Sequence, residues 1–231
     1  MVNNEYSAKR TARLAGFCYL IGSLTSVYGQ MIVWGMLIKP GNAAETSANI
    51  LSNESLFRLG FVSSFVAVPL HILWAVLFYN LFKRVSRTVS LFTAFIMIMA
   101  CVMWTISSFF YISPLLILKA KNYFDAFTRE QLQTLSLMLI KLNVQSYDIG
   151  LVFFGLWCII IGYLIFKSTF IPRIIGILEM LAGLGYLTLL WQPLVQYIYP
   201  YNLALAGPGE ISVLLWLLIK GVKNNVSIDK Q

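Results

Sequence analysis

Long apolar runs alternate with short polar segments along the whole chain. Five of the runs are long enough for an α-helix to cross a bilayer, and a sixth is shorter. None shows the two-residue alternation of a membrane β-barrel, so the runs predict helices, which satisfy their own backbone hydrogen bonds within lipid. The expected spans are residues 14–38, 59–82, 88–112, 144–166, 174–195 and 203–219.

The pattern therefore predicts an all-α, polytopic membrane protein. We expect a bundle of about six transmembrane helices in one domain over residues 1–231, with short amphipathic outer segments. Lys39-Pro40-Gly41 ends the first span, and Asn42 with Glu45 predicts a short capped surface helix after it. Ser113-Pro114 is expected to bend or end the third span.

The segment before the fourth span has two interpretations. Thr128 with Gln131 resembles a helix cap, and leucines at residues 132, 135, 139 and 142 then fall on one helical face. Residues 128–142 thus form either an interfacial amphipathic helix or an extension of the fourth span beyond the membrane.

Composition and charge agree with this class. Of the 231 residues, 59% are hydrophobic and only 11% are charged. A soluble domain carries about 25% charged residues, so the lipid bilayer is the expected environment.

The net charge of +8 comes from clusters of Lys and Arg at helix ends, which is typical of topology signals, so we expect no nucleic-acid partner. Eleven of these residues fall on the side of the termini and six on the other, which predicts a multi-pass protein of the cell membrane with both termini in the cytoplasm.

The chain contains no familiar motif of catalysis or metal binding. It lacks the nucleotide-binding, zinc-protease, paired-cysteine and nucleophile-elbow patterns, and its one histidine, His71, cannot form a multi-histidine metal site. Cys18, Cys101 and Cys158 lie in different apolar runs and are expected to be free thiols. We therefore expect no cofactor and no metal, name no catalytic residue, and favour a protein without enzymatic activity.

Several short stretches occur together in one known family. They are residues 13–20, 53–60, 147–155, 171–176 and 209–210. In this combination the chain resembles an uncharacterised family of bacterial integral membrane proteins, domain of unknown function 4386. The resemblance implies a multi-helix protein of the bacterial inner membrane, and it implies no activity. It does not extend to His71, where relatives are expected to carry other residue types.

Polar groups inside the apolar runs are the candidates for a ligand or proton site. Asp148 lies just inside the fourth span and Glu210 slightly deeper in the sixth, both in the outer half of the membrane. A charge at such depth is costly, usually shielded and often functional. The further candidates are Gln30, Gln145 and Gln192 at a similar height, His71 near the midplane, and Glu179 alone in the inner third.

We expect Asp148 and Glu210 to converge with at least one of the three glutamines on a polar cavity that opens outward. Close carboxylates of this kind suit proton transfer or cation capture. As an alternative, each of the two can cap a helix or pair with Arg58 or Lys141. His71 and Glu179 can likewise be hydrogen-bonded contacts between helices.

Three functional classes remain open. The first is binding or transport of a small solute, a proton or a lipid. Gly207-Pro208-Gly209 beside Glu210 favours this class, because broken helices mark transporter sites. The second is a non-catalytic membrane interaction or stress-related protein, in which polar residues only hold helices together. The third is an intramembrane enzyme.

Overall fold

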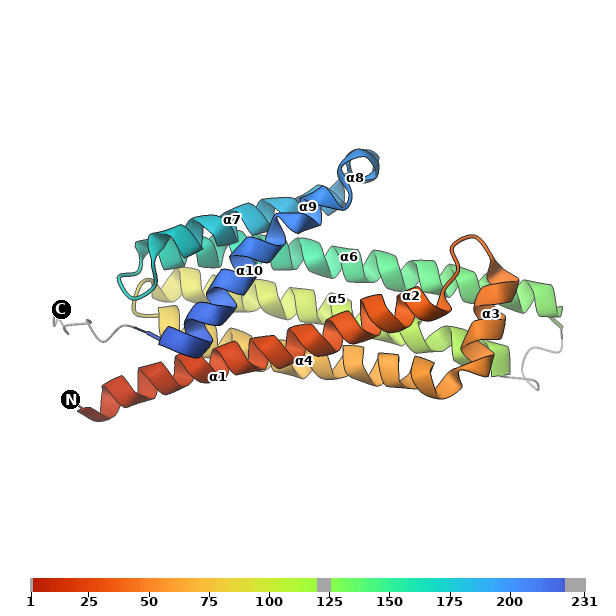
Figure 1. Ribbon diagram of the computed structural model, residues 1–231, viewed down its shortest axis with the longest axis horizontal. Coiled ribbons are helices and arrows are strands. Elements are labelled where there is room, and N and C mark those ends of the chain that lie inside the picture. Colours follow the sequence, from red (N-terminus) through yellow and green to blue (C-terminus); the bar gives the residue numbers. More distant parts are fainter. Residues whose placement is uncertain (1, 120–125, 223–231) are drawn as a thin grey trace. The chain divides into compact units, whose positions relative to one another are not determined.

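The protein is built from long apolar helices. Its computed structural model describes residues 2–119 and 126–222, with the backbone alone for residues 2–7 and 192. Within these residues, six helices are long and apolar enough to cross a membrane (Figure 1). They cover Ala8–Leu37, Glu54–Phe82, Arg87–Lys119, Arg129–Lys167, Arg173–Leu190 and Tyr201–Lys220. The predicted all-α class and the six membrane-spanning helices are confirmed.

Some spans consist of more than one helical element. The elements in chain order are α1 (Val2–Val27), the π-helix η1 (Tyr28–Val33), α2 (Trp34–Leu37), α3 (Ala43–Ser52), α4 (Glu54–Phe82), α5 (Arg87–Lys119), α6 (Arg129–Lys167), α7 (Arg173–Leu187), the 3-10 turn η2 (Thr188–Leu190), α8 (Gln192–Ile198), α9 (Tyr201–Ala204), α10 (Ala206–Leu215) and the π-helix η3 (Trp216–Lys220).

The chain divides into two compact units. The first unit comprises Met1–Leu20, Leu70–Cys101 and Ile149–Gln231, and the second comprises Ile21–Pro69 and Val102–Asp148. Four helices, α1, α4, α5 and α6, contribute residues to both units. The expectation of a single domain stays a prediction.

Helices α5 and α6 extend furthest beyond the spans that the sequence pattern indicated. Helix α5 continues through Pro114 to Lys119, so the third span does not end near residue 112. A proline removes one backbone donor, which a long helix tolerates when neighbouring groups compensate. The Ser113 hydroxyl, beside the proline, donates to the Phe109 carbonyl at 2.7 Å.

Helix α6 begins at Arg129 and runs unbroken to Lys167, so residues 128–142 extend the fourth span. Both hydrogen bonds of the predicted helix cap are present. The Gln131 backbone N–H donates to the Thr128 hydroxyl at 3.2 Å, and the Thr128 N–H donates to Gln131 Oε1 at 2.8 Å. This reciprocal pair satisfies two of the four donors that a helix start leaves unpaired.

The fifth span is shorter than expected. Helix α7 ends at Leu187, the turn η2 follows, and Trp191 leaves helical geometry with φ −120° and ψ 84°. Pro193 then lies in the first turn of the separate helix α8. A proline has no N–H to continue a helix but fits the first turn of a new one, which explains why the span stops at Leu190 instead of residue 195.

The short surface helix after the first span is confirmed as α3. The Glu45 backbone N–H donates to Asn42 Oδ1 at 3.0 Å, and the Asn42 amide donates back to Glu45 Oε2 at 3.0 Å. Gly41 precedes this cap with a positive φ of 78°, a conformation that costs glycine little.

The core of the second unit surrounds Tyr111 of α5. Its ring packs against Phe57 and Trp34, each with ring centroids 5.0 Å away, and its hydroxyl donates to the Gly29 carbonyl at 3.2 Å. Gly29 lies in η1, where a π-helical turn alters the regular hydrogen-bond ladder. Residue 29 also lies so close to α4 that a Cβ there would fall 2.4 Å from the Gly60 carbonyl oxygen.

In the first unit, paired glycines bring α6 and α7 into backbone contact. A Cβ on Gly162 would lie 2.6 Å from the Gly176 carbonyl oxygen, and one on Gly176 would lie 2.5 Å from that of Gly162. Gly155 and Gly183 form a second pair of this kind. A Cβ on Gly155 would lie 2.9 Å from the Gly183 carbonyl oxygen, and one on Gly183 would lie 2.5 Å from the Gly155 carbonyl oxygen. On the neighbouring helix α10, a Cβ on Gly209 would lie 2.7 Å from the Leu178 carbonyl oxygen. Helix α7 therefore packs closely against both α6 and α10, which positions the polar side chains described next.

Candidate functional site

The carboxyl group of Glu210, on α10, lies at the centre of a polar cluster in the first unit. The Tyr19 hydroxyl from α1 donates to Glu210 Oε2 at 2.5 Å, and the Tyr186 hydroxyl from α7 donates to Oε1. Both oxygens of one carboxyl group are thus hydrogen-bonded by tyrosines of two other helices. Glu210 is half-buried, and its side chain joins helices instead of capping α10.

Glu179 belongs to the same cluster. It lies two helical turns before Tyr186 on the same face of α7, and only 2% of its surface is exposed. The Cys158 thiol of α6 donates to its carboxyl group, while its Oε2 atom has no hydrogen-bond partner among the described residues. Glu179 and Glu210 lie close enough to interact electrostatically.

This arrangement differs from the sequence-based expectation that Glu179 lies alone in the inner third of the membrane. The Glu179 carboxyl group interacts with Glu210 and Cys158, so it is not isolated from other polar groups, while its depth in the membrane stays a prediction. The close contact of α7 with α10 at Gly209 brings the two glutamates together, since a glutamate side chain reaches across more than one helical turn.

Aromatic rings connect the two tyrosines on the side away from Glu210. The Tyr19 ring stacks on Trp74 of α4, with centroids 4.3 Å apart and planes within 8°. The Trp74 ring packs against Phe154 of α6, with ring centroids 6.1 Å apart, and Phe154 packs against Tyr186, with centroids 5.4 Å apart. Glu210, Tyr19, Trp74, Phe154 and Tyr186 therefore form a closed cycle of contacts drawn from five helices. We call these five side chains the carboxyl–aromatic ring.

His71 lies beside this ring and outside it. It is buried, and its imidazole meets Trp74 edge-on at 5.8 Å. Among the residues that the structure describes, no group of three or more His, Cys, Asp or Glu side chains could hold a metal ion. Cys18, Cys101 and Cys158 are buried free thiols.

The other predicted site residues lie elsewhere in the chain. Asp148, Gln30 and Gln145 belong to the second unit, where Asp148 and Gln30 are half-buried and Gln145 is exposed. The side chain of Gln192 lies outside the described residues. A cavity shared by Asp148 and Glu210 stays a prediction.

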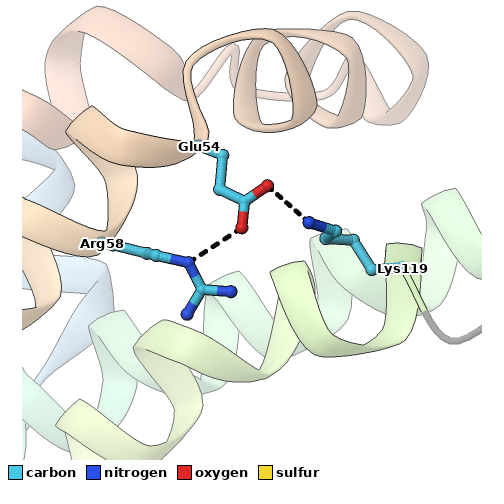
Figure 2. A network of polar contacts seen from close by, with 3 residues as sticks. All are labelled: Glu54, Arg58 and Lys119. Atoms are coloured by element: carbon cyan, nitrogen blue, oxygen red, sulfur yellow. Dashed lines mark hydrogen bonds and ion pairs between the residues drawn. The ribbon is translucent and has the colours of Figure 1, made fainter.

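The basic residues proposed as alternative partners can be placed. Arg58 Nε pairs with Glu54 Oε1 at 2.9 Å, and Lys119 Nζ pairs with the other oxygen of Glu54 at 2.6 Å (Figure 2). Arg58 thus directs its ion pair to Glu54, and Lys141 is exposed. Figure 2 shows the Glu54 carboxylate between the two basic side chains, one oxygen facing each.

Sequence reasoning missed the two tyrosines, Trp74 and Cys158 as members of the site. A signal for the tyrosines was present. Tyrosine is enriched at the membrane interfaces, whereas Tyr19 and Tyr186 lie inside apolar runs, where a hydroxyl needs a partner. Trp74 and Cys158 carried no such signal, because both are ordinary members of an apolar helix face.

Six apolar helices, with polar side chains gathered between them, define an integral, multi-pass membrane protein. Residues 14–221 match the family model "Domain of unknown function (DUF4386)", so the chain belongs to this family. The resemblance noted from the sequence is therefore confirmed.

A single stretch of the chain is similar to a curated protein. It is 33% identical over 78 residues to an uncharacterized protein of Archaeoglobus fulgidus, which covers 33% of this chain and 46% of the relative. The match thus spans about half the length of that relative. No solved structure matches the chain.

Proposed function

We propose that this membrane protein binds a small solute or a proton inside the bilayer and moves it across, with the polar cluster around Glu210 as the binding site. The observation that supports this proposal is the carboxyl group of Glu210, held between Tyr19 and Tyr186 in the interior of the sixth span. Ionisable groups at such positions are costly to insert and commonly mark substrate or proton pathways.

The shape of the sixth span supports the same proposal. At Leu205, between α9 and α10, the regular hydrogen-bond ladder of this span is interrupted while the backbone stays helical, with φ −65° and ψ −26°, and the span ends in the π-helix η3. Discontinuous helices are common at transporter binding sites, because their free backbone groups and helix ends can contact a solute. Pro208, in the first turn of α10, suits such a restart.

Orientation and compartment are part of the proposal. The distribution of Lys and Arg favours both termini in the cytoplasm of a bacterial cell, with the protein in the inner membrane. The site would then open outward, toward the side on which Asp148 is predicted to lie.

Charge movement in reconstituted liposomes tests this function. Proteoliposomes adsorbed on a solid-supported membrane receive a pH step, then a sodium step, then a step in a mixture of amino acids. We expect a transient current in the wild-type protein for at least one of these probes, and its loss in Glu210→Gln. The matched control is Glu54→Gln, because Glu54 is a more exposed carboxylate that pairs with the exposed bases Arg58 and Lys119, and this variant should keep the current.

Wild-type currents that persist unchanged in Glu210→Gln would contradict the proposal. Folded wild-type protein that gives no current with any probe would favour a second function, a membrane interaction protein without turnover. One observation favours that second function: both oxygens of Glu210 already have tyrosine donors, as a purely structural contact between helices requires.

A further inference from the structure

The two glutamates of the first unit have unequal hydrogen bonding. Glu210 accepts from two tyrosine hydroxyls, one on each oxygen. Glu179 accepts from the Cys158 thiol alone, and its Oε2 is buried with no partner among the described residues. The two groups share one cluster but differ in how well it can stabilise a negative charge.

An ionised carboxylate only accepts hydrogen bonds, and charge-assisted bonds from hydroxyl groups stabilise it strongly. Glu210 therefore has the surroundings of an ionised group. A thiol is a weak donor, so an ionised Glu179 would keep one oxygen buried and unpaired beside a second negative charge. A neutral carboxylic acid at Glu179 removes the buried charge and its repulsion from Glu210, and an unpaired neutral oxygen costs less to bury than an unpaired charged one.

We propose that the ligand of this site is a single exchangeable proton, carried by Glu179, while Glu210 stays ionised between its two tyrosines. This inference rests on the proposed function and narrows it, since it names the proton as the transported or coupling ion. The reaction is one protonation: the carboxylate of Glu179 gains H⁺ to become the neutral acid, and releases the same H⁺ to return.

The packing favours a proton over a larger cation. One face of Trp74 stacks on Tyr19, with ring centroids 4.3 Å apart, and the tilted ring of Trp157 lies 4.4 Å away, so Trp74 is closely surrounded by other rings and offers little room for a cation–π contact. The described residues also lack a set of three or more metal ligands. A proton needs neither an open ring face nor a coordination shell.

The titratable groups around Glu179 come from several helices. They are Cys158 on α6, Glu210 on α10, Tyr19 on α1, Tyr186 on α7 itself and, on the far side of Trp74, His71 on α4. Among them only Glu210 is an acid of comparable strength, so the glutamate pair determines where the proton resides.

Infrared difference spectroscopy of the protein in lipid tests the assignment. A protonated carboxylic acid gives a C=O stretching band that is separate from the bands of carboxylates and that shifts when D₂O replaces water. We expect one such band at neutral pH, lost on alkalinisation and lost in Glu179→Gln. The matched control Glu45→Gln removes an exposed surface carboxylate and should leave the band unchanged.

A second variant keeps the test decisive if Glu179→Gln fails to fold. Cys158→Ala removes the thiol that donates to Glu179, the one donor to this carboxyl group among the described residues, so the band should shift in frequency without disappearing. A band that is unchanged in both variants, or a band that disappears in Glu210→Gln instead, would overturn the proposal.

The two proposals can fail separately. A band assigned to Glu179 together with absent currents supports the proton site and contradicts transport. Wild-type currents that require Glu210 but persist in folded Glu179→Gln, with no carboxylic acid band, support transport of another solute and contradict the proton site.

Discussion

A half-buried tyrosine that becomes phenylalanine loses one oxygen and keeps its ring, so Tyr186→Phe isolates the hydroxyl from the packing against Phe154. One oxygen of Glu210 then loses its donor. We expect the free energy of unfolding to fall by about 1–2 kcal/mol, the range of hydrogen bonds to charged groups and between membrane helices. Unfolding by a denaturing detergent in mixed micelles measures this change.

The control for this prediction is Tyr163→Phe. Tyr163 is 46% exposed, and its ring lies 5.8 Å from Lys167 Nζ, a contact that phenylalanine retains. Its unfolding free energy should stay within about 0.5 kcal/mol of the wild type. Equal losses in the two variants would show that the Tyr186 hydroxyl has no special role.

Single residues also show what the sequence could predict at the candidate site. Glu210 was identified correctly as a polar group inside a span, because a carboxylate stands out in an apolar run. Its partner Tyr19 could not be found in this way, since the two residues lie 191 positions apart and only helix packing brings them together. Glu179 was identified but expected to lie alone, because depth along a span does not report which helix faces meet, and in the structure it interacts with Glu210 and Cys158.

At the level of elements, the contact between α6 and α7 depends on the absence of side chains. Gly162→Ala would place a Cβ 2.6 Å from the Gly176 carbonyl oxygen, on backbone that cannot move aside cheaply. We expect a loss of about 1–3 kcal/mol in unfolding free energy, typical of overpacking.

The matched control is Gly35→Ala on α2, where a Cβ meets nothing within 4 Å. Alanine favours a helix over glycine by about 1 kcal/mol, so this variant should be neutral or more stable. A destabilised Gly35→Ala, or an unaffected Gly162→Ala, would contradict the close approach of the two helices.

The start of α6 offers a prediction at the same scale. Thr128→Ala removes the hydroxyl that accepts from the Gln131 N–H, so the first turns of α6 should fray. The expected cost is about 0.5–2 kcal/mol, seen as faster hydrogen exchange in residues 129–135 and not in the rest of the helix. Thr134→Ala is the control, because Thr134 donates only to the Glu130 carbonyl within the helix. Uniform exchange along α6 in both variants would contradict the cap.

Helix starts were predicted well where side chains close in the sequence determine them. The caps at Asn42 and Thr128 depend on side chains three residues apart, which the sequence displays directly. The ends near prolines were predicted less well. Pro114 lies inside a continuous helix, whereas Pro193 follows a break, and the difference depends on surrounding packing that a local pattern does not contain.

For the whole molecule, the distribution of Lys and Arg predicts which side of the membrane each connecting segment faces. Asn42 precedes α4 and Ser86 follows it, so a helix that crosses the membrane separates them. In a variant with Cys18, Cys101 and Cys158 replaced, we expect Asn42→Cys to react with an impermeant thiol reagent on intact cells, and Ser86→Cys to react only after lysis. Labelling of position 86 alone in intact cells would reverse the orientation.

The carboxyl–aromatic ring also bears on how the chain is made. A ribosome delivers Tyr19 with the first span and Glu210 with the last, 191 residues later. Until that last segment enters the bilayer, the hydroxyls of Tyr19 and Tyr186 lack the acceptor that they have in the finished protein. In a nascent chain that stops before residue 201, these two hydroxyls are therefore without the Glu210 carboxyl group, and a polar group without a partner is costly in lipid.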